Sequence, residues 1–356
     1  MKLRSRHNAD GIALIIAVIA VLVLSTLAAG LALSMRVETR LAFNANSETQ
    51  MYWLGRSGVE FARWILAQER CPYDSLNQIW AGGPGSDCET NGPLAGTTLD
   101  NIPVGGGIIS VKITDLERKA NINSAGGGEI QQALTLMGVD ANDMSVVSDS
   151  IQDWIDADDL PRVAGAESDY YQGLDPPYYA KNAPIDDLSE LLLVRSITPE
   201  MYWGGSATNH AVAAFQHKLG LGNAPGQTPD YPFGLVDLFT AISSGRININ
   251  TANENVLQLI PGVDAIVAEN IIKLRAGPDG VDGTDDDTPI QDPNGALQSA
   301  GMAPALLAPA LGMITTRSST FEVHVTAKIG LQTREYIAIL LRNSGTDIRV
   351  VSFYWK

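Results

Sequence analysis

The stretch from Ile12 to Met35 decides the fold, and it reads IALIIAVIAVLVLSTLAAGLALSM. It contains no charged residue and consists mostly of isoleucine, valine, leucine and alanine. As a helix it would be about 36 Å long, which is enough to cross the hydrocarbon core of a bilayer. The sequence therefore predicts one transmembrane helix at residues 12–35.

The basic residues in front of this stretch predict its orientation. Lys2, Arg4 and Arg6 precede it, and basic residues beside a transmembrane helix are retained in the cytoplasm. We therefore expect a single-pass protein with a cytoplasmic N-terminus and with most of its chain on the outer side of the membrane.

Three kinds of N-terminal segment share this outline. The first is a cleaved secretory signal, which has a shorter apolar core than residues 12–35. The second is a signal anchor, which remains an alternative. The third kind is indicated by Gly11, which lies between the basic leader and the apolar run. This arrangement resembles a type IV prepilin. The resemblance implies that a prepilin peptidase cuts after Gly11 and methylates the new N-terminus at Ile12.

The helical pattern extends well past the membrane. No proline occurs between the start of the anchor and Pro72, so the helix can continue to about that point. Apolar residues recur there at spacings of three and four, which is typical of a helix with one face in a core. They are Met51, Leu54, Gly58, Phe61 and Ile65. A long helix, half in lipid and half on a globular head, resembles the pilin fold.

Composition and charge exclude several classes of protein. The chain has 356 residues, of which 45% are hydrophobic and 18% charged, as in ordinary globular proteins of two or three domains. The formal net charge is -16. Nucleic acid is therefore a poor partner for most of the surface, while cations are good ones.

The two cysteines, Cys71 and Cys88, lie close together in a stretch rich in glycine and proline. In an exported protein such a pair predicts a local disulfide, which would stabilise the fold by about 3 kcal/mol in the chain-entropy description. The alternative is two unpaired thiols in a cytosolic protein, and the predicted membrane helix disfavours it.

The strand pattern predicts one small antiparallel sheet. Alternation of apolar and polar residues marks 108–116 and 320–329, and further strands are predicted at 333–342 and 348–355. A long, mostly helical region separates the first strand from the others. We therefore expect an α+β protein. A long N-terminal transmembrane helix packs on the sheet in a pilin-like fold, and a large, mostly α-helical domain is inserted in it.

The expected parts are a prepilin leader at 1–11, a transmembrane segment at 12–35, a first pilin-like part at 36–118, an inserted helical domain at 119–312 and the C-terminal pilin-like strands at 313–356.

The inserted region contains an internal sequence repeat. Asn121-Ile-Asn-Ser-Ala is followed by Gly138-Val-Asp, and Asn248-Ile-Asn-Thr-Ala is followed by Gly262-Val-Asp. The serine or threonine of each copy can cap a helix, and each Gly-Val-Asp can turn the chain into a second helix. We interpret the repeat as two related helical hairpins. The second resembles a DNA-binding helix-hairpin-helix, but Asp264 would repel phosphate, so we expect a structural hairpin and no nucleic-acid partner.

Two further stretches carry a more specific resemblance. Residues 153–193 and residues 237–250 resemble the K-type minor pseudopilin of type II secretion systems. With the leader and the last strands, the resemblance covers essentially the whole chain, and it is weakest at about 70–105 and 205–230. Most pilins carry a glutamate at the fifth mature position, which here is Ile16. The K type is the member known for lacking it.

The resemblance implies a place in the cell and a set of partners. It implies a minor pseudopilin at the tip of the periplasmic pseudopilus, anchored in the inner membrane and complexed with the I-type and J-type minor pseudopilins. It also implies contacts with the inner-membrane secretion platform and with secreted proteins, which are exported folded across the outer membrane. The alternative is a signal-anchored periplasmic protein that works alone and binds calcium or a glycan.

Two acidic clusters are candidate calcium sites. The first lies on a glycine-rich loop, where crowded carboxylates repel one another unless a hard cation neutralises them; it comprises Asp279, Asp282, Asp285, Asp286 and Asp287. The family resemblance also implies structural Ca²⁺ in the helical domain. The second cluster comprises Asp153, Asp156, Asp158 and Asp159, together with Glu167 and Asp169. Its alternative is helix capping together with salt bridges to Arg162.

Catalysis finds little support in the sequence. The four histidines are scattered, and His210 and His217 share a predicted helical face without a nearby cysteine or glutamate for zinc. No nucleophile elbow, P-loop or dinucleotide fingerprint occurs. We therefore expect a protein that is not an enzyme.

Overall fold

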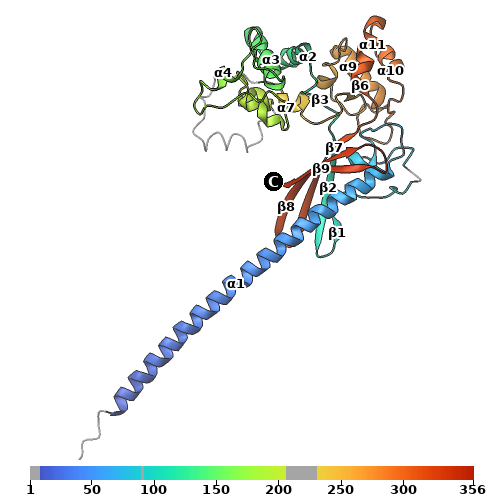
Figure 1. Ribbon diagram of the computed structural model, residues 1–356. Helices are drawn as coiled ribbons and strands as arrows, with labels where there is room; N and C mark the ends of the chain where they lie inside the picture. The colour runs from blue at the N-terminus through green and yellow to red at the C-terminus, as the bar shows by residue number, and fades with distance from the viewer. Residues whose placement is uncertain (1–8, 90–91, 206–230) are drawn as a thin grey trace, which may run out of the picture.

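The computed structural model describes residues 9–89, 92–205 and 231–356 (Figure 1). It shows a mixed α+β protein in which a very long N-terminal helix carries a sheet and a helical region at its far end. The basic leader residues 1–8 and both histidines of the predicted helical face, His210 and His217, lie outside the described residues.

Helix α1 runs without a break from Ala9 to Gln68. Its part from Leu14 to Thr39 is long and apolar enough to cross a membrane, and none of it is buried against the rest of the protein. This fits a single-pass, signal-anchored protein. The described apolar segment ends four residues later than the predicted one, because the charged residues Arg36 and Glu38 interrupt the run without ending the helix.

The sheet has five strands in the order β1-β2-β7-β8-β9, and every neighbouring pair is antiparallel. The strands are β1 Ile102–Val104, β2 Gly107–Asp115, β7 Thr320–Ile329, β8 Gln332–Arg342 and β9 Ile348–Trp355. Four of them confirm the predicted strands. The sequence pattern missed β1, which is only three residues long and contains Pro103.

The second half of α1 packs on one face of this sheet. Met51, Leu54 and Ile65 of the predicted stripe are buried, and Phe61 is half-buried at its margin. Two glycines allow the helix to approach closely. A Cβ atom at Gly55 would lie 2.5 Å from the Tyr336 ring, and one at Gly58 would overlap Val325.

The region between β2 and β7 is the predicted helical insertion. Its helices are α2 Gly127–Met137, α3 Ala141–Ile155, α4 Ser168–Tyr171, η2 Leu188–Leu193, α5 Pro199–Trp203, α7 Leu235–Leu238, α8 Glu254–Leu257, α9 Ala265–Arg275, α10 Pro293–Ser299 and α11 Pro304–Met313. Two short parallel pairs join it, β3 Ala120–Asn121 with β4 Phe239–Thr240 and β5 Ile247–Asn248 with β6 Ile314–Thr315.

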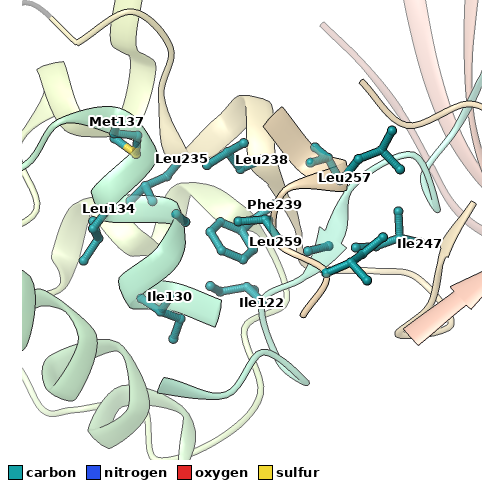
Figure 2. Close-up of a cluster of buried hydrophobic side chains, with 14 of the residues drawn as sticks. Ile122, Ile130, Leu134, Met137, Leu235, Leu238, Phe239, Ile247, Leu257 and Leu259 are labelled. Carbon is teal, nitrogen blue, oxygen red and sulfur yellow. The ribbon is translucent and has the colours of Figure 1, made fainter. Parts of the chain in front are cut away.

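The insertion has an apolar core of its own, separate from the core between α1 and the sheet. Figure 2 shows side chains from α2, α7 and α8 meeting in this core around Phe239. Because burial of apolar area is the main favourable term in folding, a second core gives the insertion its own source of stability. In Figure 1 the insertion lies at the end of the molecule farthest from the apolar half of α1.

The internal sequence repeat corresponds to two helix pairs, α2 with α3 and α8 with α9. In each, a glycine with positive φ, Gly138 or Gly262, precedes an aspartate that caps the second helix. The predicted serine and threonine caps are wrong, because Gly126 and Asn253 occupy the N-cap positions. Thr251 instead donates a hydrogen bond to the buried carboxylate of Asp115, where a strong acceptor is available.

A buried polar network joins the insertion to the sheet. Asp115, the last residue of β2, accepts hydrogen bonds from Asn248 Nδ2 at 3.1 Å, Thr251 Oγ1 at 2.6 Å and Ser318 Oγ at 2.7 Å. Asn248 also donates to the backbone oxygen of Asp74. The chain therefore leaves the sheet, passes through the insertion and returns at one hydrogen-bonded junction.

On the sheet, His324 of β7 lies between two carboxylates. Its Nε2 is 2.7 Å from Glu322 and its Nδ1 is 2.8 Å from Glu335 of β8. The hydrogen bond to Glu322 is the largest cause that raises the pKa of His324, and Glu335 adds to it against the effect of burial. The folded state therefore binds a proton at His324 more tightly than the unfolded state does.

This raised pKa predicts the sign of a pH dependence. The stabilisation is fully present below the unfolded pKa of about 6.5 and is lost as the pH rises through the higher folded value. We expect the free energy of unfolding to fall by about 1 kcal/mol over that range, and His324→Gln to remove this part of the slope. Denaturant titrations of detergent-solubilised protein at pH 5 to 9 would measure it; equal slopes in both proteins would contradict it.

Candidate functional site

The predicted processing site lies in the first turn of α1. Gly11 and Ile12 follow the start of the helix at Ala9. Ile16, at the position where most pilins carry a glutamate, points an apolar and exposed side chain outward from the helix. No carboxylate occurs between Ile12 and Met35, so none has to be offset inside lipid, where an isolated charge is costly.

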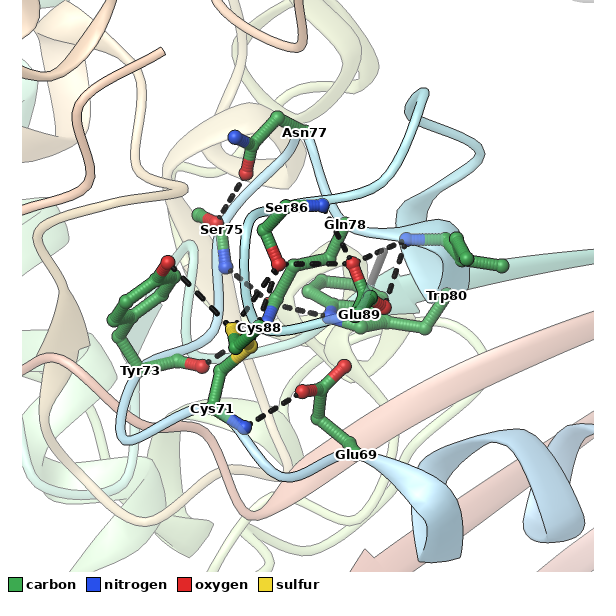
Figure 3. The surroundings of a disulfide bond; sticks show 11 residues. Glu69, Cys71, Tyr73, Ser75, Asn77, Gln78, Trp80, Ser86, Cys88 and Glu89 are labelled. Atoms are coloured by element: carbon green, nitrogen blue, oxygen red, sulfur yellow. Dashed lines mark hydrogen bonds between the residues drawn. A yellow bond between two sulfur atoms is a disulfide. The ribbon is translucent and has the colours of Figure 1, made fainter. Parts of the chain in front are cut away.

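Directly after α1, Cys71 and Cys88 form a disulfide, as the sequence predicts, with Cα atoms 5.7 Å apart (Figure 3). Cys71 is buried and Cys88 is exposed. The loop is held by carboxylates that accept backbone hydrogen bonds. Glu89 accepts from Ser86 N at 2.8 Å, and Glu69 accepts from Cys71 N at 2.9 Å. Burial raises the pKa of Glu69 to about 8.

The favoured acidic loop is organised by hydrogen bonds of its own. Asp282 accepts hydrogen bonds from Nε and Nη2 of the buried Arg275 guanidinium, at 2.9 and 2.6 Å. Asp286 accepts from Asp279 N at 3.0 Å and from the Thr284 hydroxyl at 2.7 Å, and these bonds lower its pKa. Asp287 accepts from Gly283 N at 2.8 Å, while Asp285 is exposed.

These contacts separate the carboxylates of the loop. Among the described residues, the groups of three carboxylate or thiol side chains that come within 4.8 Å of one another include none from 279–287. The buried Arg275 neutralises the central aspartate of the loop, Asp282, without a metal.

The second cluster has the geometry that the first lacks. Ligand oxygens of Asp156, Asp158 and Glu167 lie within 4.8 Å of one another. The Glu167 side chain, 3% exposed, has two buried oxygens without a hydrogen-bond partner, and the same holds for Oδ1 of Asp156 and Oδ1 of Asn182. The Asn182 amide nitrogen donates to the backbone oxygen of Asp158 at 2.7 Å. This hydrogen bond holds the Asn182 side chain, with its unpaired oxygen, beside the cluster.

The other two predicted residues have structural partners. Asp153 is buried in α3, where it accepts from Arg162 N at 3.1 Å and lies 3.6 Å from its guanidinium. Asp159 accepts from Ser168 N at 3.3 Å. Arg162 also pairs with Asp156 at 3.1 Å. The alternative of capping and salt bridges to Arg162 therefore holds for part of the cluster, but it leaves Glu167 without a partner.

The electrostatics of this cluster follow from that imbalance. Burial raises the pKa of Glu167 to about 7, and repulsion from Asp153, Asp156, Asp159 and Asp158 adds to it. A buried carboxylate without a donor costs several kcal/mol unless it is neutralised. The donor set is made of oxygen alone, which suits a hard cation such as Ca²⁺. The residues present therefore fit a calcium ion at this position.

The sequence pattern included Glu167 in the second cluster only as one acid among several, and it gave no indication of Asn182. Glu167 lies eight residues beyond Asp159, so only the fold of the intervening chain brings it to Asp156 and Asp158. A glutamate directly before the short helix α4 is an ordinary N-terminal residue by pattern. Burial, which distinguishes it, is not visible in the sequence.

Comparisons with known proteins agree with the resemblance in the sequence. The family described as "Type II secretion system (T2SS), protein K" matches residues 111–204. A type II secretion system protein K of Pseudomonas aeruginosa is 26% identical over 301 residues, covering 80% of this chain and 77% of that protein. Proteins of the same name from Pectobacterium carotovorum and Aeromonas hydrophila are 30% and 26% identical, and the matches cover 35% and 62% of their lengths.

The fold also has a solved counterpart. A chain in the crystal structure of the GspK-GspI-GspJ complex from the type 2 secretion system of enterotoxigenic Escherichia coli matches with a TM-score of 0.61 at 18% sequence identity. The match covers 88% of this chain and 98% of that one. Protein K relatives match along most of the sequence, and the fold agrees over nearly all of it. The chain is thus similar to the type II secretion system protein K family in sequence and in fold.

Proposed function

We propose that this protein is a minor pseudopilin at the tip of the pseudopilus of a type II secretion system, where it supports the export of folded proteins across the outer membrane. The observation that carries the proposal is α1. One continuous helix of 60 residues has an exposed apolar half and a second half that forms part of the core of the head. Such a helix can leave the membrane and pack beside other helices without refolding the head.

The position at the tip is supported by the size and place of the insertion. It lies at the end of the molecule opposite the membrane-spanning half of α1 (Figure 1). A subunit stacked directly above would meet this bulk instead of the sheet. The apolar Ile16 adds a second argument, because a subunit without a carboxylate there need not pair with the N-terminal amine of a neighbour.

The partners proposed are the I-type and J-type minor pseudopilins, since the solved structural counterpart belongs to a complex with GspI and GspJ. On this chain, α1 offers a surface for such helices above the membrane segment. Tyr52, Trp53 and Trp64 are 44%, 62% and 41% exposed on it, and aromatic side chains are enriched where proteins meet.

The proposed location is the inner membrane, with a cytoplasmic N-terminus and a periplasmic head. The disulfide supports this, because such bonds persist in oxidising compartments. We further infer a structural and not a catalytic role, in keeping with a family whose members are named as components of a secretion system.

Calcium is the proposed structural cofactor, and Asp156, Asp158 and Glu167 with the Asn182 oxygen would hold it. It would supply the positive charge that the buried Glu167 lacks and would fix α4 to the end of α3. A second ion on the loop 279–287 stays a prediction, because hydrogen bonds and Arg275 already satisfy most of those carboxylates.

Processing at Gly11 tests the assignment to the pseudopilins. We expect the protein extracted from membranes to lack residues 1–11 and to carry one added methyl group on Ile12, but only in cells that contain prepilin peptidase. Intact-mass spectrometry of protein from cells with and without the peptidase measures this. Full-length protein in both strains would exclude a pseudopilin and leave a signal-anchored protein that works alone.

Deletion of residues 120–310 tests the tip position. We expect the shortened subunit to allow stacking above itself, so that pseudopili grow past their normal length when measured by electron microscopy. Circular dichroism of the purified variant would check that the sheet and α1 remain folded. Pseudopili of normal, limited length with a folded variant would contradict the proposed role of the insertion.

The calcium proposal predicts a selective loss of stabilisation. Calcium at a hundred times its Kd should stabilise the wild-type protein by about 2.7 kcal/mol relative to the chelator-treated protein. Glu167→Gln should lose most of this gain, whereas Asp169→Asn, which alters an exposed acid two residues away, should keep it. Asp285→Asn tests separately whether an ion on the loop 279–287 contributes to the gain in stability. Thermal unfolding with and without calcium measures all four proteins, and an equal gain in Glu167→Gln would contradict the site.

A further inference from the structure

The two edge strands of the sheet differ in how they are protected. β1 has three residues, whereas β9 has eight and reads IRVVSFYW. Its one charged residue, Arg349, is held by Asp347 at 2.9 and 3.0 Å. Val351, Tyr354 and Trp355 are 55%, 48% and 64% exposed. Within the described part of the chain, no strand pairs with the outer side of β9. Long, apolar edges of this kind are templates for another strand.

The backbone of β9 has donors and acceptors that face outward. Lys356 N donates to Glu335 O at 3.0 Å, which makes these two residues a hydrogen-bonded pair. Hydrogen-bonded and non-bonded pairs alternate along antiparallel strands. Trp355, opposite Tyr336, and Phe353, opposite Ala338, are therefore non-bonded pairs. Their N–H and C=O groups point away from β8, which is what a further strand requires.

A cleft of about 430 Å³ adjoins this edge on the sheet face opposite α1. The row formed by Glu322, Ile339 and Ser352 across three strands forms its floor. Its other wall belongs to the insertion, at Asp186 and Asp187. A strand added to β9 would continue this row, so one of its side chains would enter the cleft.

The charge of the cleft selects that side chain. Three carboxylates line it, Asp186, Asp187 and Glu322, against the single ammonium group of Lys119. Lys119 donates to Val236 O at 2.7 Å, so part of its hydrogen-bonding capacity is already used within the protein.

Two of the acids have partners in addition. Asp186 pairs with Lys181 at 2.7 Å and Glu322 with His324 at 2.7 Å. Burial and the nearby Glu322 and Asp187 raise the pKa of Tyr354 at the mouth of the cleft. Lys181 is also shared with Glu190 and His324 with Glu335, so carboxylates still outnumber cations around the cleft, which favours an added cation over an anion.

We propose that β9 and this cleft together bind an extended segment of another protein, which adds to β9 as a further strand and places a lysine or arginine side chain in the acidic cleft. The backbone groups of Phe353 and Trp355 would provide affinity, and the carboxylates would provide specificity, as in other cases of strand addition. This inference does not depend on the secretory role proposed above.

A blocked eight-residue peptide that alternates valine and threonine and carries one central lysine tests the proposal. We expect it to bind the full-length, detergent-solubilised protein in a calorimeter. A peptide with glutamate in place of the lysine should bind at least about tenfold more weakly, which corresponds to a loss of at least about 1.4 kcal/mol of binding free energy. A peptide with a central proline should not bind, because proline cannot donate to a strand ladder.

Variants of the protein locate the binding. Trp355→Pro removes the outward N–H, whereas Trp355→Ala removes the same indole and keeps the N–H. We expect the proline variant alone to lose binding of the lysine peptide. Asp186→Asn should reduce the preference for lysine over glutamate without abolishing binding. Equal binding by both Trp355 variants, no binding of any peptide to the wild-type protein, or an unchanged preference in Asp186→Asn would each overturn the proposal.

Discussion

The rest of the structure depends on one constraint, which is that a single helix must be stable both in lipid and against the core of the head. The N-terminal half of α1 exposes apolar side chains on every side, as a helix in lipid does, while the C-terminal half buries one stripe against the sheet. Because the helix is continuous, the head is positioned by the packing of a few turns. Gly55 and Gly58 allow this packing to be close, since any side chain there would overlap Tyr336 or Val325.

A second constraint fixes the insertion without disturbing that packing. The chain leaves the sheet after β2 and returns before β7, and these strands are neighbours. The insertion can therefore be long, provided that its two ends meet. Asp115, Asn248 and Ser318 make them meet through buried hydrogen bonds, and the ion pair of Asp74 with Arg342 ties the disulfide loop to the same place. Buried polar groups are costly when unpaired, so this junction specifies one arrangement of the two cores.

The sequence could predict what is set locally and could not predict what depends on contacts between distant segments. Periodicity revealed the long helix, its buried stripe and four strands, because side-chain burial repeats with the backbone geometry. It failed for β1, whose three residues are too few to show a period. For the metal, crowding along the chain favoured the loop 279–287. There, Arg275 and backbone amides satisfy most of the acids. Both oxygens of Glu167, by contrast, lack a hydrogen-bond partner, and only the fold brings this residue to Asp156 and Asp158.

These features divide the surface by the kind of contact that each part permits. The exposed aromatics of α1 lie on the helix that continues into the membrane, so they suit neighbours whose own helices run alongside it. β9 lies at the side of the head and offers unpaired backbone groups, which suit an extended chain of any sequence that can place a cation in the adjoining cleft. The insertion covers the end farthest from the membrane with a separately folded core. A subunit built in this way can be held from the side by several partners, while the insertion, and not the sheet, lies at the end away from the membrane segment.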